Sequence, residues 1–121
     1  MLGAKLFGSG LNTLATNAMV NDGQTALVAA GTTQATALEL TNAVNVLGTV
    51  ASGAGVKLLA LSSPYDSMLV FNGGANVLKV YPDLGSKINN LATNAGINLQ
   101  TNTACEFTRV STTQWIAVLS A

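Results

Sequence analysis

From Gln24 onward, short apolar or threonine-rich runs alternate with clusters of Gly, Asn, Pro and Ser, roughly every ten residues. Short strands separated by turn residues at this spacing are typical of all-β sandwiches and barrels. The predicted strands are Thr25 to Ala30, Ala35 to Leu40, Val44 to Val50, Val56 to Leu61, Met68 to Phe71, Val77 to Tyr81, Ile97 to Gln100, Ala104 to Val110 and Gln114 to Leu119. We therefore expect a mainly β fold, an antiparallel β-sandwich or jelly-roll, in one domain over residues 23–121.

Residues 1–22 do not follow the strand pattern. Five apolar side chains in this segment fall at helical spacing: Leu11, Leu14, Ala15, Ala18 and Met19. Ser9 is a suitable N-cap, but glycines and asparagines weaken the helix. An N-terminal arm that becomes ordered only against a neighbour is the equal alternative. In either case Leu11 and Leu14 are candidates for contact with another chain.

A glycine-rich loop, Asn72 to Asn76, joins the predicted strands Met68 to Phe71 and Val77 to Tyr81. Its glycines tolerate positive φ, so the three segments predict a β-hairpin. Tyr81 lies on the mixed face of the second strand, opposite the face that packs inside. That mixed face meets solvent or a partner, which makes Tyr81 a candidate interface residue.

The last strand of the chain is apolar on both faces. Ser111 to Thr113 separates it from the strand that includes Cys105 to Val110, which predicts a C-terminal hairpin. In a single-layer sheet, such a strand would leave an apolar stripe in water, and a subunit contact is a natural cover. The candidate interface residues on it are Trp115, Ile116, Val118 and Leu119.

An internal similarity links Leu11 to Ala18 with Ile88 to Ala95, but chance explains it in a chain rich in Ala, Thr and Asn. Solenoid repeats require three or more units at a fixed period, and the sequence shows none. We therefore do not expect a repeat architecture.

The composition favours contact between neutral surfaces. Charged residues make up 8% of the 121 residues and hydrophobic residues 49%, whereas about a quarter of an average soluble domain is charged. A neutral surface suits close subunit contact, because few charges have to be desolvated. The five basic residues are scattered, which argues against nucleic acid as a partner. No apolar run approaches the roughly 18 residues that span a bilayer, and Gly8 to Gly10 interrupt any signal-peptide core, so we expect no membrane partner.

Residues suited to catalysis are scarce. Histidine is absent, and the single cysteine, Cys105, is interpreted as a small buried hydrophobe. The five carboxylates show no catalytic spacing, and Asp22 and Asp66 have the context of turn residues. Gly53 to Val56 resembles part of a phosphate loop but lacks the following Lys-Ser/Thr, so it is interpreted as a turn. We expect no catalytic residues, no cofactor and no metal site.

The aromatic residues offer one candidate binding feature. Tyr65, Tyr81 and Trp115 are the residue types that form sugar-stacking platforms. Trp115 lies in an apolar strand, where a core or interface position is more typical. Tyr65 follows Ser62-Ser63-Pro64 and is therefore the aromatic expected on a loop, as a candidate contact residue.

The segment Val70 to Pro82, followed by Ile88-Asn89, Phe107 and Thr113-Gln114-Trp115, resembles small structural proteins of tailed bacteriophages. In those proteins a strand, an Asn-Gly hairpin, a Val-Tyr-Pro strand end and a terminal Gln-Trp recur in that order. The resemblance extends from about Gln24 to the C-terminus, and it departs from the pattern at Asp83, where another proline or a small residue is expected. It implies a capsid decoration (cement) protein or a β-sandwich module of a fibre or spike, commonly trimeric, and it implies no catalytic residues.

The expected function is therefore that of a non-enzymatic homotrimer that binds the major capsid protein on the outside of a phage head and stabilises the shell. Its expected location is the capsid exterior of the virion, after assembly in the host cytoplasm. The alternative is a trimeric β-module of a fibre or spike that binds host glycans through Tyr65. A small β-fold hydrolase is the third hypothesis, and the lack of histidine and of paired acids argues against it.

Overall fold

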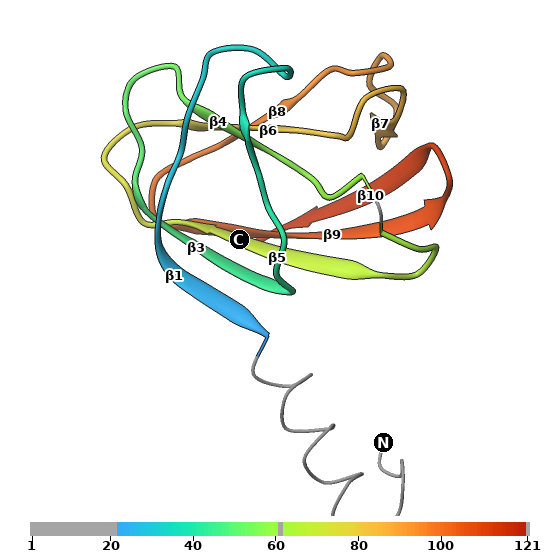
Figure 1. Cartoon of the computed structure of the whole chain (residues 1–121), viewed down its shortest axis with the longest axis horizontal. Helices are drawn as coiled ribbons and strands as arrows, with labels where there is room; N and C mark the ends of the chain where they lie inside the picture. The colour runs from blue at the N-terminus through green and yellow to red at the C-terminus, as the bar shows by residue number, and fades with distance from the viewer. Residues whose placement is uncertain (1–21, 61, 121) are drawn as a thin grey trace, which may run out of the picture.

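The structure is a computed structural model that describes residues 22–60 and 62–120 (Figure 1). The predicted arm or helix, with Leu11 and Leu14, lies outside the described residues. Within them the chain forms ten strands and no helix, which confirms the mainly β prediction.

The ten strands form two sheets. One has six strands in the order β1-β3-β5-β9-β10-β7, and the other has four in the order β2-β4-β6-β8. The strand bounds are β1 (Gly23–Val28), β2 (Leu38–Glu39), β3 (Val44–Thr49), β4 (Gly55–Lys57), β5 (Ser67–Asn72), β6 (Leu78–Tyr81), β7 (Lys87–Ile88), β8 (Ile97–Leu99), β9 (Thr103–Ser111) and β10 (Gln114–Leu119). Figure 1 shows the two sheets as two layers, with β4, β6 and β8 above β1, β3, β5 and β9.

The chain winds between the two sheets from strand to strand. In the six-stranded sheet, Val44 of β3 pairs in parallel with Gly23 of β1 on one side and with Leu69 of β5 on the other. In the four-stranded sheet, β2, β4 and β6 are likewise parallel neighbours. Parallel neighbours need a crossover connection, and here the crossover contains a strand of the opposite sheet. The arrangement is therefore β-solenoid-like, and the expected antiparallel sandwich or jelly-roll is wrong in its connectivity.

Each coil of the solenoid-like chain path contributes one strand to each sheet, and successive coils differ in their number of residues. For that reason the sequence shows no repeat. Val56 of β4 pairs with Leu38 on one side and with Val80 on the other, so the second interval in the chain is longer than the first. A repeat can be recognised in a sequence only when its units recur at a fixed number of residues. The pairing of strands from successive coils is visible only in the structure.

One predicted hairpin is correct and the other is wrong. β9 and β10 form the C-terminal antiparallel hairpin, with Ile116 opposite Thr108. By contrast, β5 and β6 belong to different sheets, so Asn72 to Asn76 is an arch between sheets and not a hairpin turn.

The arch is held by Asn72. Its side-chain Nδ2 donates to the carbonyl oxygens of Asn76 and Leu99, each at 2.9 Å, and its Oδ1 accepts from the backbone N–H of Gly74. Neither glycine of the arch has positive φ. Gly74 is required for space instead, because a Cβ there would lie 2.7 Å from Val50. The buried amide thus links β5 to β8 of the other sheet.

The core lies between the two sheets and follows the alternation of the strands. On β5, Met68, Val70 and Asn72 are buried while Ser67 and Leu69 are exposed. Leu47, Val56 and Phe107 are fully buried members of the same cluster. Complete burial of each such side chain contributes about 1.5–3 kcal/mol to the free energy of unfolding.

Candidate interaction surface

The outward side of the six-stranded sheet carries an apolar surface. Across the sheet, Val44 of β3 lies opposite Leu69 of β5, which lies opposite Glu106 of β9, which in turn lies opposite Val118 of β10. Residues paired in this way project from the same face of a sheet. All four are exposed, Leu69 at 38% and Val118 at 64%.

Two further rows of paired residues extend this surface. Val46, Phe71 and Ala104 form the next row, and each is partly exposed. On the opposite side, Ser67, Thr108 and Ile116 form a row in which the two hydroxyl oxygens lie 2.8 Å apart. The three rows together make up the outer face of the sheet: Val44, Val46, Ser67, Leu69, Phe71, Ala104, Glu106, Thr108, Ile116 and Val118.

Glu106 is the one charged residue of the outer face. Its cross-strand neighbours are Leu69 and Val118, so the carboxylate stands between two exposed aliphatic side chains. Among the described residues the salt bridge that forms is between Arg109 and Asp83, and it leaves Glu106 without a cationic neighbour. A surface that is uncharged except for one carboxylate fits a partner that is uncharged except for one cation.

The edge of this sheet that β1 forms is less suited to pairing with a strand of another chain. β1 is its long edge strand, and its register against β3 shifts on both sides of Leu27. Ala26 has a positive φ of 60° at this irregularity. Bulges of this kind protect an edge strand from adding a further strand. The face of the sheet is therefore a better candidate for contact than its edge.

The predicted interface residues of the last strand divide between the two sides of the sheet. Ile116 and Val118 lie on the outer face, and Leu119 is exposed at the end of β10. Trp115 is fully buried. Its ring therefore belongs to the core and is not available to a partner, which corrects its place among the interface candidates.

The two tyrosines also differ. Tyr81 is half-buried, and its hydroxyl donates to the carbonyl oxygen of Thr32 at 3.2 Å, so it anchors a loop. Tyr65 is 80% exposed and has a φ of 72°. It stands on a loop, as the sequence predicts.

Sequence reasoning missed Val44, Leu69 and Glu106 as members of the surface. The signal was the period-2 alternation along β3 and β5, which assigns Val44 and Leu69 to the side opposite Leu47 and Val70. The side that faces water could not be chosen without the pairing of the strands. Without that pairing, an apolar residue on such a strand can be assigned to the core as readily as to the surface.

A buried polar cluster lies on the inward side of β9. The guanidinium of Arg109 donates from Nη2 to Oδ1 of Asp83 and from Nε to Oγ of Ser62, each at 2.7 Å. Its Nη1 donates to the carbonyl oxygen of Thr112, also at 2.7 Å. Trp115 Nε1 donates to the same Asp83 oxygen at 2.9 Å, and the guanidinium carbon lies 4.6 Å from the centre of the Trp115 ring. These contacts satisfy the buried charges within the protein, which identifies a structural cluster.

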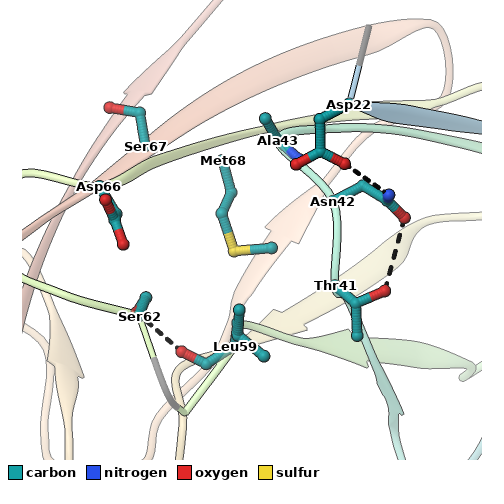
Figure 2. A pocket seen from close by; sticks show the side chains of 9 residues that line it. All are labelled: Asp22, Thr41, Asn42, Ala43, Leu59, Ser62, Asp66, Ser67 and Met68. Atoms are coloured by element: carbon teal, nitrogen blue, oxygen red, sulfur yellow. Dashed lines mark hydrogen bonds between the residues drawn. The ribbon is translucent and has the colours of Figure 1, made fainter. Parts of the chain in front are cut away.

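A shallow pocket of about 110 Å³ lies between the loop before β3 and the loop before β5. Figure 2 shows the Met68 side chain in its middle, with Asp22 and Asn42 on one side and Ser62 and Asp66 on the other.

The polar groups of this pocket are bound to the protein itself. Asp22 Oδ1 accepts from Asn42 Nδ2 at 2.7 Å, and Asp66 Oδ2 accepts from the backbone N–H of Ser63 at 2.7 Å. Ser62 Oγ donates to the carbonyl oxygen of Leu59 at 2.8 Å. Asp66 thus holds a turn, as its sequence context predicts, whereas Asp22 ties the start of β1 to the loop before β3.

The buried thiol of Cys105 has no activating group beside it. Burial raises the pKa of the thiol to about 11, and the carboxylate of Glu106 adds to this effect. A hydrogen bond with the backbone of Val118 acts in the opposite direction. Because the thiolate is the nucleophilic form, this cysteine is a poor nucleophile near neutral pH, and its burial confirms the interpretation as a small core residue.

Residues 22–60 and 62–120 contain no cluster of three or more potential metal ligands. No helix in that part of the chain is long and apolar enough to cross a membrane. Comparison of the chain with known protein families, with curated proteins and with solved structures found no match.

Proposed function

We propose that this chain is a non-enzymatic structural protein that acts by assembly, as a homotrimeric decoration protein on the outer surface of a phage capsid. The observation that carries the proposal is the outer face, on which exposed aliphatic residues and the partly exposed Phe71 surround one carboxylate. Apolar surfaces of this kind are typical of interaction sites. The resemblance of Val70 to Pro82 and of Gln114-Trp115 to phage structural proteins supports the viral role.

The proposed mechanism is stabilisation by binding to the assembled shell. A trimer that touches several coat subunits at once gains affinity by multivalency, although each contact is modest. Binding to the shell, and not to its separated subunits, then raises the stability of the shell by mass action. The low charge of the chain keeps the desolvation cost of these contacts small.

The native mass of the purified protein tests the first step. Light scattering coupled to size exclusion is expected to give a trimer that dissociates on dilution. A monomer at all concentrations up to the millimolar range would contradict the proposal of self-association.

Capsids with and without the protein test the second step. Particles that lack it are expected to burst at a lower temperature than particles to which it has been added back. Equal bursting temperatures at saturating protein would contradict a stabilising role.

Tyr65 supports a second candidate function, a fibre or spike module that binds host glycans. Tyr65 is 80% exposed, on a loop on which Ser62 and Asp66 line the shallow pocket. Exposed aromatic rings beside hydroxyl and carboxylate groups suit sugar recognition. A glycan-array signal that is lost on Tyr65→Ala would favour this candidate, and the absence of any signal for the wild-type protein would remove it.

A further inference from the structure

Simple face-to-face packing of two copies is a poor way to cover the outer face. In a two-fold contact, the same patch of both copies meets itself. Glu106 lies on β9 between Leu69 and Val118, near the middle of the patch, so a two-fold contact centred on the patch would bring two carboxylates together. Like charges in a desolvated contact are destabilising. A better-matched occupant offers a cation to Glu106 and uncharged, mostly apolar side chains to the rest of the face.

Residues 1–21 of this chain have that chemistry. Lys5 is their only charged side chain, and apolar residues are frequent among them. The helically spaced residues Leu11, Leu14, Ala15, Ala18 and Met19 would supply an apolar stripe to an apolar surface. No acidic residue in the segment would repel Glu106.

The segment also ends where it can reach such a surface. Asp22 precedes β1 directly, and its carbonyl oxygen accepts from the backbone N–H of Val44, a residue of the outer face, at 3.1 Å. Glu106 is on β9, three strands away from β1, which is roughly 14 Å at about 4.8 Å per strand. The chain from Lys5 to Asp22 spans roughly 25 Å as a helix and roughly 55 Å when extended. The segment is therefore long enough to cross one such sheet face as far as Glu106.

The fixed position of Asp22 favours a neighbouring copy over the segment's own sheet. Its carboxylate accepts from Asn42 Nδ2 at 2.7 Å and from the backbone N–H of Ala43 at 3.3 Å, in addition to the bond from Val44. These bonds hold Asp22 in line with β1 at the end of the sheet. Gly23 lies in the same row as Val44, Leu69 and Glu106, so a segment that covered its own outer face would have to turn at Asp22 across the strands. A segment that continues in the direction of β1 leaves its own sheet and meets a neighbouring copy.

We propose that residues 1–21 of one copy dock on the outer face of the next copy, with Lys5 opposite Glu106. Each copy then gives one segment and receives one. Head-to-tail contacts of this kind close into a ring when the rotation permits, which is compatible with the trimer. This inference rests on the self-association proposed above and adds the surface and the segment that produce it.

The first test exchanges the two charges in the full-length chain. Lys5→Glu and Glu106→Lys are each expected to weaken self-association by roughly 5- to 10-fold, because an ion pair is replaced by like charges. The double variant is expected to recover most of the loss. Lys87→Glu makes the same charge change on an exposed residue of β7, and it is the matched control with no expected effect.

The second test identifies the copy that receives the segment. Lys5→Cys chains and Glu106→Cys chains, mixed under oxidised glutathione, are expected to form a disulfide-linked heterodimer. A mixture of Lys5→Cys and Leu84→Cys chains is the control, since Leu84 is 79% exposed but lies outside the outer face. The link should be absent from that mixture.

The outcomes separate this inference from the proposed function. A trimer whose mass and affinity are unchanged by both charge reversals would overturn the docking inference and leave self-association intact. A disulfide that forms only within single chains of the Lys5→Cys/Glu106→Cys double variant would overturn the exchange between copies. A wild-type protein that is monomeric at every concentration would overturn both proposals.

Discussion

Asp83 and Arg109 form a buried ion pair that joins the segment after β6 to β9, with Nη2 of Arg109 2.7 Å from Oδ1 of Asp83. The same carboxylate oxygen accepts from Trp115 Nε1. The acid stands directly after Pro82, where the sequence pattern led to the expectation of another proline or a small residue. Its contacts account for an acid at this position, because Arg109 is buried and needs a counter-charge.

Removal of the carboxylate is expected to be strongly destabilising. Asp83→Ala leaves the guanidinium of Arg109 buried without its counter-ion, and breaking a buried pair from one side costs about 3–5 kcal/mol. Urea unfolding followed by tryptophan fluorescence measures the loss, since Trp115 lies in the same cluster. The exposed Lys87→Ala is the control and should stay within about 0.5 kcal/mol of wild type. A loss below 1 kcal/mol for Asp83→Ala would contradict the structural role of the pair.

Two glycines with similar backbone conformation are expected to respond differently to alanine. Gly31 and Gly85 have φ values of 75° and 88°. A Cβ on Gly31 would clash with the carbonyl oxygen of Thr36, whereas nothing lies within 4 Å of a Cβ on Gly85.

Gly85→Ala should therefore carry the conformational cost alone, about 1–2 kcal/mol, and Gly31→Ala should carry a steric cost in addition. Thermal unfolding of both variants under one set of conditions gives the comparison. Equal melting temperatures for the two variants would mean that the loop around Gly31 adjusts freely to the added methyl group.

A charge placed on the outer face is expected to reduce self-association without unfolding the protein. Val118→Lys puts an ammonium group on a residue that is 64% exposed on β10, so the folded monomer should tolerate it within about 0.5 kcal/mol. Dilution series by light scattering should show a dissociation constant raised at least tenfold, because the charge must be desolvated in the contact. Leu84→Lys, on a residue outside this face, is the matched control. The prediction fails if both variants assemble like wild type.

Strand positions were largely predictable from the sequence, because burial alternates along each strand. The predicted Val44 to Val50, Met68 to Phe71 and Gln114 to Leu119 correspond closely to β3, β5 and β10. The two-residue strand β7 was missed because Lys87 and Ile88 are too few to show a period. β7 pairs with Gln114 and Trp115 of β10, and the local pattern of apolar and polar residues carries no information about this tertiary contact.

Strand partners were not predictable, and the candidate surface depended on them. The sequence Asn72-Gly73 is typical of a hairpin turn. In the structure, however, the Asn72 side-chain amide donates a hydrogen bond to the carbonyl oxygen of Leu99 in the other sheet, and the chain leaves β5 for that sheet. Only with β3 placed beside β5, and β9 beside β5, do Val44, Leu69 and Glu106 form one row. These paired residues are far apart in the sequence, and local propensity cannot choose among the possible pairings of distant strands.

The buried thiol predicts a loss of stability at alkaline pH. Burial raises the pKa of Cys105 from 9.0 to about 11, so the unfolded chain releases this proton at a lower pH than the folded chain does. Below pH 9 both states hold the proton and the thiol contributes no pH dependence. Between pH 9 and about 11 the unfolded state is progressively favoured by ionisation, and stability falls as pH rises. Cys105→Val lacks the ionisable group, so the difference in unfolding free energy between the variant and wild type should shift in favour of the variant across this range. Urea titrations at pH 8, 9, 10 and 11 measure that difference, and a constant value over the four would show that the thiol ionises equally easily in the folded and the unfolded chain.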